Sequence, residues 1–436
     1  MKQKNLQYQH KCKNIEVVFN KDWFEESPKC PHGPMLLFEE LVVSSKGINN
    51  TKRYYACAAS RDRKFCPCYI KEADFKKNKK VFKQDLCNPC LPSYLDVHSL
   101  NEKYFCYKSQ KFILNFNAIT YPNNSHIKRL NETEMLNPSK TFIKASQDNK
   151  FKAQFFLKNK CLEFLLNEIQ RLGYSHVLCM GMPRLHEAIQ TLKNPSLIDS
   201  YFLDIDDRYS MFWSSNKFSK FNMFNHYFFN ETDKPMLQKF MKSSKQLLLV
   251  TDPPFGGLVE CLKNTFSWFN DINKCETMLI FPYFNHSKIK EVLPDFNMCD
   301  YVIEYDNHKK YKEKSSPVRI FTNIDLKLIK LPLDEGYKFC KYCEKYGLKE
   351  NLHCSICNTC PSLNGKTYVH CFKCEKCVKP GLKHCNSCNR CQPVKGHQCR
   401  GIIKNKCHIC GSENHKRRNC PERHNIPPVK KIKLDN

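Results

Sequence analysis

Residues 247–260, "LLLVTDPPFGGLVE", place an acid, two prolines and an aromatic ring directly after an apolar run. A carboxylate at such a tip accepts hydrogen bonds, a ring stacks on a planar base, and adjacent prolines hold the backbone rigid. Together they could hold a planar amino group, with its two hydrogens on the carboxylate and on a proline carbonyl. The candidate catalytic residues are therefore Asp252, Pro253, Pro254 and Phe255.

The most specific metal signal lies near the C-terminus, in "CHICGSENHKRRNC". Its spacing, C-x2-C-x4-H-x4-C, is that of a zinc knuckle, which is a module for single-stranded RNA. Lys416, Arg417 and Arg418 add positive charge inside the loop, where it suits phosphates. The predicted ligands are Cys407, Cys410, His415 and Cys420.

Upstream of this knuckle, the unit HC-x2-C-x2-C repeats in "HCSICNTC", "HCFKCEKC" and "HCNSCNRC". Interleaving the units gives each zinc ion three cysteines and one histidine, although adjacent His-Cys pairs also permit other partitions. The array resembles the cysteine-rich domain of protein palmitoyltransferases, but "KGHQC" replaces their Asp-His-His-Cys and no membrane span accompanies it, so we reject acyl transfer. The expected sets are Cys340, Cys343, His353 and Cys360; Cys354, Cys357, His370 and Cys377; Cys371, Cys374, His384 and Cys391; and Cys385, Cys388, His397 and Cys399.

Composition supports metal binding and a polyanionic partner. The 436 residues carry a formal net charge of +28, which favours nucleic acid. We find no apolar run long enough to span a membrane and no apolar segment typical of a secretory signal near the N-terminus. The chain is therefore expected in a reducing compartment, where its 28 cysteines serve as metal ligands rather than disulfides.

The middle of the chain, from about 151 to 330, reads as an α/β core. Apolar runs at 175–181, 200–206, 245–252, 277–284, 300–306 and 318–324 predict strands, and segments such as 184–193 and 257–269 predict helices between them. This alternation indicates a mostly parallel sheet with both faces covered. Ligands of such sheets bind at the carboxyl ends of the strands, where Gly181, Asp204, Asp206 and Asp252 would lie.

The motif at Asp252 resembles that of amino-group methyltransferases that use S-adenosyl-L-methionine and share a Rossmann-like, seven-stranded fold. With "VLCMGMPRLHEAI", "FLDIDDRYS", "FNMFNHYFF" and "SPVRIFTNI", most of the chain resembles the zinc-finger CCHC-type ribosomal-RNA N6-adenosine methyltransferase family. The resemblance implies methylation of N6 of an adenosine in large-subunit ribosomal RNA. It also implies a cofactor site formed by Cys179, Met180, Gly181, Met182, Arg184, Asp204, Asp206, Asn222, Met223 and Asp252.

The N-terminal part resembles a GRF-type zinc finger in "CPHGP" and "RYYACAASRDRKFCPC". The matching ligands are Cys30, His32, Cys57 and Cys66, with Cys68 as a spare or alternative thiol. The two-Cys, two-His finger that follows in the family looks lost, because Cys106 is followed by Ser109 where a second cysteine is expected. Whether Cys87 and Cys90 bind metal stays open.

These features divide the chain into seven expected regions. They are a tail (1–27), the GRF-type finger (28–75), a connector with the degenerate finger (76–150), the methyltransferase core (151–330), the multi-zinc domain (334–402), the knuckle (403–424) and a basic tail (425–436). The basic tail reads equally well as a nuclear-import signal or a disordered end, and we expect a nuclear, nucleolar and also cytoplasmic location. Two other functions stay open: an RNA-binding zinc protein with an inactive core, and an amino-methyltransferase for another substrate, such as DNA or a protein amide.

Overall fold

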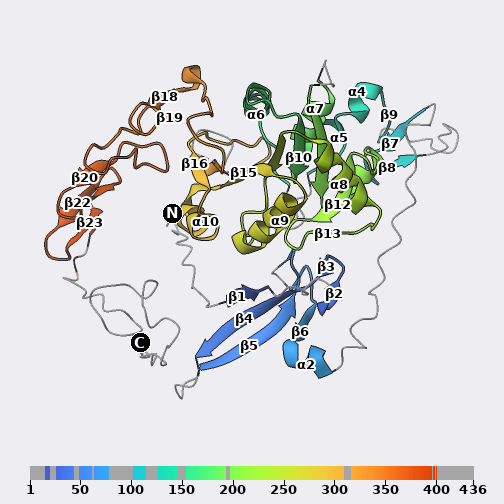
Figure 1. Cartoon of the computed structure of the whole chain (residues 1–436), viewed down its shortest axis with the longest axis horizontal. Coiled ribbons are helices and arrows are strands. Elements are labelled where there is room, and N and C mark those ends of the chain that lie inside the picture. Colours follow the sequence, from blue (N-terminus) through green and yellow to red (C-terminus); the bar gives the residue numbers. More distant parts are fainter. Residues whose placement is uncertain are drawn as a thin grey trace. The chain divides into compact units, whose positions relative to one another are not determined.

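The computed structural model describes residues 15–19, 26–43, 49–60, 63–77, 102–113, 126–145, 154–192, 197–308, 316–394, 396–397 and 399. The chain divides into two compact units. The first comprises Met1–Cys30, Pro34–Leu86 and Gly381–Asn436, and the second comprises Pro31–Gly33 and Cys87–Pro380. Both are drawn in Figure 1. No described helix is long and apolar enough to cross a membrane.

The N-terminal segments of the first unit build a four-stranded sheet in the order β1-β4-β5-β6. Strand β1 pairs antiparallel with β4, so the sheet extends into the region expected to be a tail. The elements are β1 (Ile15–Val18), β2 (Lys29–Cys30), β3 (Gly33–Pro34), β4 (Leu36–Val43), β5 (Asn49–Ala56), β6 (Tyr69–Lys71) and α2 (Glu72–Lys77).

The second unit contains the predicted α/β core, an eight-stranded sheet in the order β13-β12-β11-β10-β14-β15-β17-β16. Strands β12, β11, β10, β14 and β15 are parallel, while β13, β17 and β16 pair antiparallel with their neighbours. Without the two-residue β13, this is the expected seven-stranded sheet. Its strands are β10 (His176–Met180), β11 (Asp199–Asp204), β12 (Phe218–Asn222), β13 (Tyr227–Phe228), β14 (Leu247–Thr251), β15 (Cys275–Pro282), β16 (Asn297–Cys299) and β17 (Val318–Thr322).

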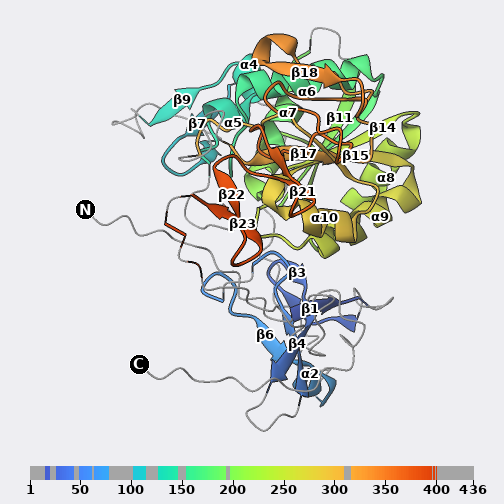
Figure 2. The ribbon, with the colours of Figure 1, turned by 90° about the vertical axis from the view of Figure 1, so that its left-hand side faces the viewer.

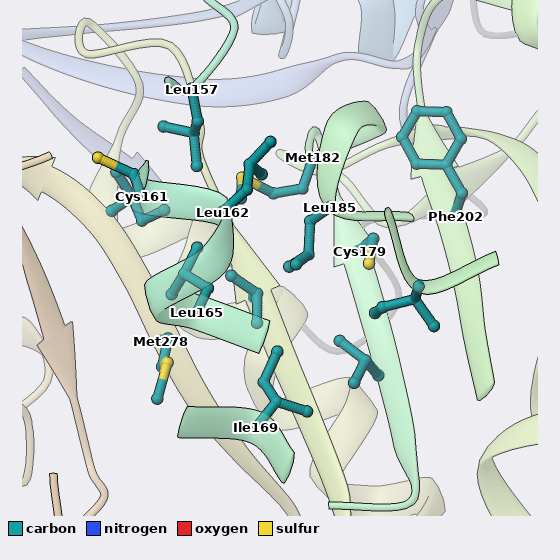
Figure 3. Close-up of a cluster of buried hydrophobic side chains, with 14 of the residues drawn as sticks. Leu157, Cys161, Leu162, Leu165, Ile169, Cys179, Met182, Leu185, Phe202 and Met278 are labelled. Atoms are coloured by element: carbon teal, nitrogen blue, oxygen red, sulfur yellow. The ribbon is translucent and has the colours of Figure 1, made fainter. Parts of the chain in front are cut away.

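Helices cover both faces of this sheet, as Figures 1 and 2 show. Apolar residues three and four apart on α6 form a stripe that packs on alternate residues of the strands. In Figure 3, Leu162, Leu165 and Ile169 of α6 lie over Cys179 of β10 and Met278 of β15, and all five are buried. The helices are α6 (Asn159–Arg171), α7 (Pro183–Gln190), η2 (Asp207–Met211), α8 (Asp233–Ser243), α9 (Val259–Ile272), η3 (Tyr283–Asn285), α10 (His286–Val292) and η4 (Leu333–Glu335).

One predicted strand is wrong. Residues 300–306 do not join the sheet as a strand, since β16 ends at Cys299 and only the isolated pair Leu157–Tyr305 forms a bridge. Several backbone groups of this segment find partners outside the sheet. The N–H of Val302 donates to the Tyr337 hydroxyl at 2.9 Å, and the N–H of Glu304 donates to a cysteine sulfur.

Small sheets precede and follow the core. A three-stranded sheet contains β7 (Tyr104–Cys106), β8 (Lys111–Ile113) and β9 (Ile127–Arg129), and the short helices α4 (Glu132–Met135) and α5 (Pro138–Thr141) follow it. The Cys/His array consists of two-stranded hairpins, as expected where metal ligands rather than a large apolar core would hold the chain together. These are β18 (Tyr337–Cys340) with β19 (Lys345–Leu348), β20 (Val369–Cys371) with β21 (Lys376–Val378), and β22 (Leu382–Cys385) with β23 (Arg390–Pro393).

Candidate functional site

The register of three parallel strands brings the expected ligand residues to one edge of the sheet. Met180 of β10 pairs with Leu203 of β11 and with Thr251 of β14. The next residues of the three strands are Gly181, Asp204 and Asp252, so the glycine lies between the two acids. Two backbone hydrogen bonds continue the ladder here, from Gly181 N to Leu203 O (2.8 Å) and from Asp252 N to Met180 O (3.3 Å).

Gly181 occupies a position that requires glycine. Its φ is +68°, a conformation that other residues adopt with strain. A Cβ here would lie 3.2 Å from Cε of Met223 and 3.3 Å from the backbone oxygen of Asp252. The missing side chain lets the backbone approach closely between Met223 and Asp252.

Asp252 is partly exposed, and one of its oxygens is already engaged. The Tyr305 hydroxyl donates to Oδ1 of Asp252 at 3.0 Å. Although the residue keeps some exposed surface, burial of its carboxyl raises the pKa of Asp252 to about 8, and the Tyr305 hydrogen bond partly opposes that rise. No described residue donates to the second oxygen, Oδ2, which stays available to a ligand.

The two prolines after Asp252 differ in whether their backbone carbonyls accept a hydrogen bond. The carbonyl of Pro254 accepts from the N–H of Gly257 at 2.7 Å. The carbonyl of Pro253 accepts no hydrogen bond from a described residue, so it is the proline carbonyl that remains for an amino group. Phe255 is partly buried and lies edge-on to Phe281 and Tyr305, with ring centroids 6.1 and 6.3 Å apart.

The two acids at the end of β11, Asp204 and Asp206, have different surroundings. Asp204 is buried and its Oδ1 accepts from the N–H of Asp206 at 2.9 Å. Burial raises the pKa of Asp204 to about 7, with the charge of Asp206 adding to the rise. Asp206 instead uses both oxygens within the protein. Its Oδ2 accepts from Arg208 at 2.6 Å and from Gln154 at 2.8 Å, and its Oδ1 accepts from Nε of Arg208 at 2.9 Å. The family resemblance places both acids at the ribose or adenosine part of the cofactor, and Asp204 is therefore the better acceptor there.

The family resemblance places Asn222 and Met223 near the adenine ring of the cofactor, and these two residues have different surroundings. The amide of Asn222 is buried, donates to the backbone oxygen of His32 at 2.7 Å and accepts from the N–H of Phe224 at 3.1 Å. Met223 is partly exposed, and Gly181 lies next to its terminal methyl group. Met223 thus lies beside the edge of the sheet, while the Asn222 side chain fixes the turn that carries it.

The other residues expected around the cofactor are buried or bound to other parts of the protein. Cys179, Met180 and Met182 are buried. Arg184 is partly exposed, donates to Leu157 O at 2.9 Å and pairs with Asp306. Leu157 and Tyr305 form a β-bridge, and Arg184 therefore connects helix α7 to both of the chain segments that form it. Its guanidinium is engaged there rather than with a ligand. Sequence reasoning missed Tyr305 altogether, and its only signal was an aromatic residue at the end of a predicted strand.

The five Cys/His sets expected within the described residues are each brought together. Their ligand atoms lie within 4.8 Å of one another in every set. The sets are Cys30, His32, Cys57 and Cys66; Cys340, Cys343, His353 and Cys360; Cys354, Cys357, His370 and Cys377; Cys371, Cys374, His384 and Cys391; and Cys385, Cys388, His397 and Cys399.

The spacing of the sulfur atoms fits zinc and excludes disulfides. Tetrahedral zinc with bonds of about 2.3 Å to sulfur places two thiolates about 3.8 Å apart, whereas a disulfide needs about 2.05 Å. The Sγ–Sγ distances are 3.8 Å for Cys343–Cys360, 3.7 Å for Cys357–Cys377 and 3.6 Å for Cys385–Cys399. The donor sets therefore fit structural zinc ions.

The turns after the paired cysteines share one backbone feature. Glu344, Asn358, Glu375 and Asn389 each follow a C-x2-C unit, and each has a φ between +47° and +50°. Gln110 has a φ of +54° at the equivalent place after Cys106 and Ser109. The connector therefore keeps the same turn as the C-x2-C units of the Cys/His array, although Ser109 replaces the second cysteine.

Within the described residues, Cys106 belongs to no group of three candidate ligands. The knuckle ligands Cys407, Cys410, His415 and Cys420, the open pair Cys87 and Cys90, and the basic tail lie outside the described residues.

Comparison with known proteins gives matches both to the core and to most of the chain. Residues 148–326 match the family described as "Probable N6-adenine methyltransferase". The chain is 40% identical to "rRNA N(6)-adenosine-methyltransferase ZCCHC4" of Homo sapiens, over 93% of this chain and 85% of that protein. It is 38% identical to the protein of the same name in Xenopus laevis, over 93% and 88%, and 38% identical to that of Bos taurus, over 96% and 86%.

Proposed function

This chain belongs to the rRNA N(6)-adenosine-methyltransferase ZCCHC4 family, and we propose that it methylates N6 of an unpaired adenosine in large-subunit ribosomal RNA. The observation that carries the proposal is that neither Oδ2 of Asp252 nor the carbonyl of Pro253, at the carboxyl end of β14, accepts a hydrogen bond from a described residue. This pair can accept both hydrogens of one planar amino group.

Three groups at the edge of the sheet fit S-adenosyl-L-methionine. Gly181 leaves room for a close approach, Asp204 offers a buried acceptor for ribose hydroxyls, and the partly exposed Met223 supplies an apolar wall. When bound there, this cofactor supplies an electrophilic methyl group on sulfur. The chain's own residues must then orient the adenine and manage its protons.

Adenine N6 is a poor nucleophile because its lone pair is delocalised into the ring. Oδ2 of Asp252 and the carbonyl of Pro253 would hold the two amino hydrogens and direct the lone pair out of the ring plane. The raised pKa of Asp252 also suits it to take up the proton that the amine loses. Phe255 would stack on the base, held in place by Phe281.

The repeated zinc hairpins supply a surface suited to RNA. Tyr342 is 66% exposed and Phe372 is 75% exposed, and each lies inside a C-x2-C turn next to a lysine. Residues 337–380 contain eight lysines and three glutamates, so the thiolates of the bound ions do not cancel the positive charge. Exposed rings that alternate with lysines are typical of surfaces that stack unpaired bases and contact phosphates.

The same reasoning supports a nuclear and nucleolar location, with the cytoplasm as a second compartment. The basic tail, "PPVKKIKLDN", and a ribosomal RNA substrate are the two features behind this part of the proposal. Fusion of the chain, with and without residues 425–436, to a fluorescent protein would test it by microscopy.

The activity is tested by incubating the full chain with labelled S-adenosylmethionine and total RNA, followed by nucleoside analysis. We expect label in N6-methyladenosine from large-subunit RNA, and none from Asp252→Ala. Asp295→Ala, at an exposed acid away from the edge, serves as the control. Label in DNA or protein alone would point to another substrate, and cofactor binding without transfer would indicate an inactive core.

A further inference from the structure

Tyr305 lies outside the recognised motif, yet its hydroxyl contacts the candidate catalytic acid. The side chain is fully buried, and its hydroxyl donates to Oδ1 of Asp252 at 3.0 Å. Its ring packs against Phe155 and Phe255, with centroids 5.9 and 6.3 Å away. One residue therefore contacts both the acid and the ring that are expected to hold the base.

The contact leaves the two oxygens of Asp252 in different states. Oδ1 is held by Tyr305, whereas no described residue donates to Oδ2. A carboxylate held at one oxygen cannot rotate freely, so the other oxygen keeps one direction. That fixed direction is what an acceptor for an amino hydrogen requires.

Tyr305 itself is held on the side of helix α7. It forms an antiparallel bridge with Leu157, and the N–H of Asp306 donates to Phe156 O at 2.8 Å. Arg184 contacts both segments, through Leu157 O and the Asp306 carboxylate.

The chain before Tyr305 is held by the first zinc hairpin. The N–H of Val302 donates to the Tyr337 hydroxyl at 2.9 Å, and Oδ2 of Asp300 accepts from the N–H of Leu348 at 3.0 Å. Tyr337 begins β18 and Leu348 ends β19, the hairpin that carries Cys340 and Cys343. Both ends of the segment are therefore fixed, and the Tyr305 hydroxyl cannot easily leave Asp252.

We infer that Tyr305 is a positioning residue for methyl transfer, whose hydroxyl fixes Asp252 so that its second oxygen receives the amino group of the substrate. The inference rests on the proposed function, because it assigns a role within that site.

The rate of methyl transfer should depend on the ionisation of Asp252. Only ionised Asp252 is a full acceptor, so the rate should rise with pH through the pKa of this acid. The Tyr305 hydrogen bond lowers that pKa, and its removal should move the rise to higher pH.

The charged groups around Tyr305 are paired. Glu304 binds Lys158 and Lys160, and Asp306 binds Arg184. His308 is a further titratable neighbour among the described residues, with its ring centroid 6.3 Å from that of Tyr305. All of these groups stay unchanged when only the Tyr305 hydroxyl is removed.

The test measures kcat/KM for Tyr305→Phe across pH 6 to 9.5 on the full chain, with an RNA that the wild-type protein methylates. We expect the rise in rate to move up by about one pH unit, which is an approximately tenfold loss at pH 7 that narrows at high pH. Cofactor affinity, measured by calorimetry, should not change. Tyr301→Phe, which removes another buried hydroxyl from the same segment, is the matched control.

Repeating the measurement in the Asp252→Asn variant distinguishes a positioning role of Tyr305 from a purely structural one. In Asp252→Asn the acid is absent, so adding Tyr305→Phe should leave the pH profile where it was. If Tyr305→Phe lowers the rate equally at every pH, or leaves the profile of the wild type, the inference is overturned. A wild-type chain that methylates no RNA would instead overturn the proposed function.

Discussion

Replacing Asp252 with asparagine should stabilise the protein, and by more at high pH than at low pH. Asparagine has nearly the same shape and its Oδ1 can still accept from the Tyr305 hydroxyl. It carries no charge, however, and so avoids the cost of placing an ionised carboxylate at a poorly hydrated position. The site would thus have kept an acid for chemistry at the expense of stability.

The sign and size of the effect follow from the pKa of Asp252. Burial raises this pKa from its ordinary value near 3.8 to about 8. Between these values the folded protein holds a proton that the unfolded chain has lost, so the wild type loses stability as pH rises from about 4 to 8. Between pH 6 and pH 8 the loss amounts to about 2 kcal/mol, since each bound proton contributes about 1.36 kcal/mol per pH unit.

The assay compares unfolding temperatures of the two proteins at pH 6 and pH 8, with cofactor and RNA absent and zinc retained. A change of 1 kcal/mol shifts the unfolding temperature by roughly 2–4 °C in a domain of this size. We therefore expect the asparagine variant to gain about 4–8 °C over the wild type on going from pH 6 to pH 8. Other buried acids, such as Glu187, whose pKa burial raises to about 8, contribute alike to both proteins and cancel in the difference.

Two results would refute this reasoning. One is a temperature difference that is the same at both pH values, which would mean that Asp252 titrates normally. The other is a variant that is less stable than the wild type at pH 8, which would mean that the charge is stabilised in the fold.

The remaining predictions concern metal, cofactor and RNA. Elemental analysis should find five to six zinc ions per chain, and chelation should unfold the zinc hairpins; one ion or none in folded, active protein would contradict the assigned sets. Asp204→Asn should weaken cofactor binding at least tenfold in calorimetry, whereas Asp206→Asn should act less, because that carboxylate serves Arg208 and Gln154. Phe372→Ala should weaken binding of single-stranded RNA roughly fivefold to a hundredfold without changing cofactor affinity, and equal losses from Leu333→Ala, another exposed apolar residue, would argue against base stacking.

The sequence predicted the core because the signals that define it are local. Five of its apolar runs form strands close to the expected bounds, and the segments at 184–193 and 257–269 overlap α7 and α9. The seven-stranded topology came from the family resemblance, and the chain adds only the two-residue β13. The zinc sets could also be predicted from the sequence. Their cysteines come in pairs two residues apart, in turns of one repeated shape, so the local sequence already brings two ligands of each ion together.

The spatial partners of the site residues depend on tertiary structure. Asp204 and Asp206 look alike in sequence. Only the structure shows that the carboxylate of Asp206 already accepts hydrogen bonds from Gln154 and Arg208. The two prolines are equivalent by residue type, and a local turn distinguishes them, because the N–H of Gly257 donates to the carbonyl of Pro254.

Tyr305 illustrates the limit most clearly. Residues 300–306 have the apolar pattern of a strand, yet they form none. The N–H of Ile303 still donates to Val318 O of β17 at 3.2 Å, but the N–H groups of Val302 and Glu304 donate to side chains instead. The contact of Tyr305 with Asp252 spans 53 residues of sequence and exists only because β14 and the segment after β16 end at the same edge. Local pattern determined which residues could do chemistry, whereas the order and register of the strands decided which of them meet, because a hydrogen bond depends on distance in space and not on separation along the chain.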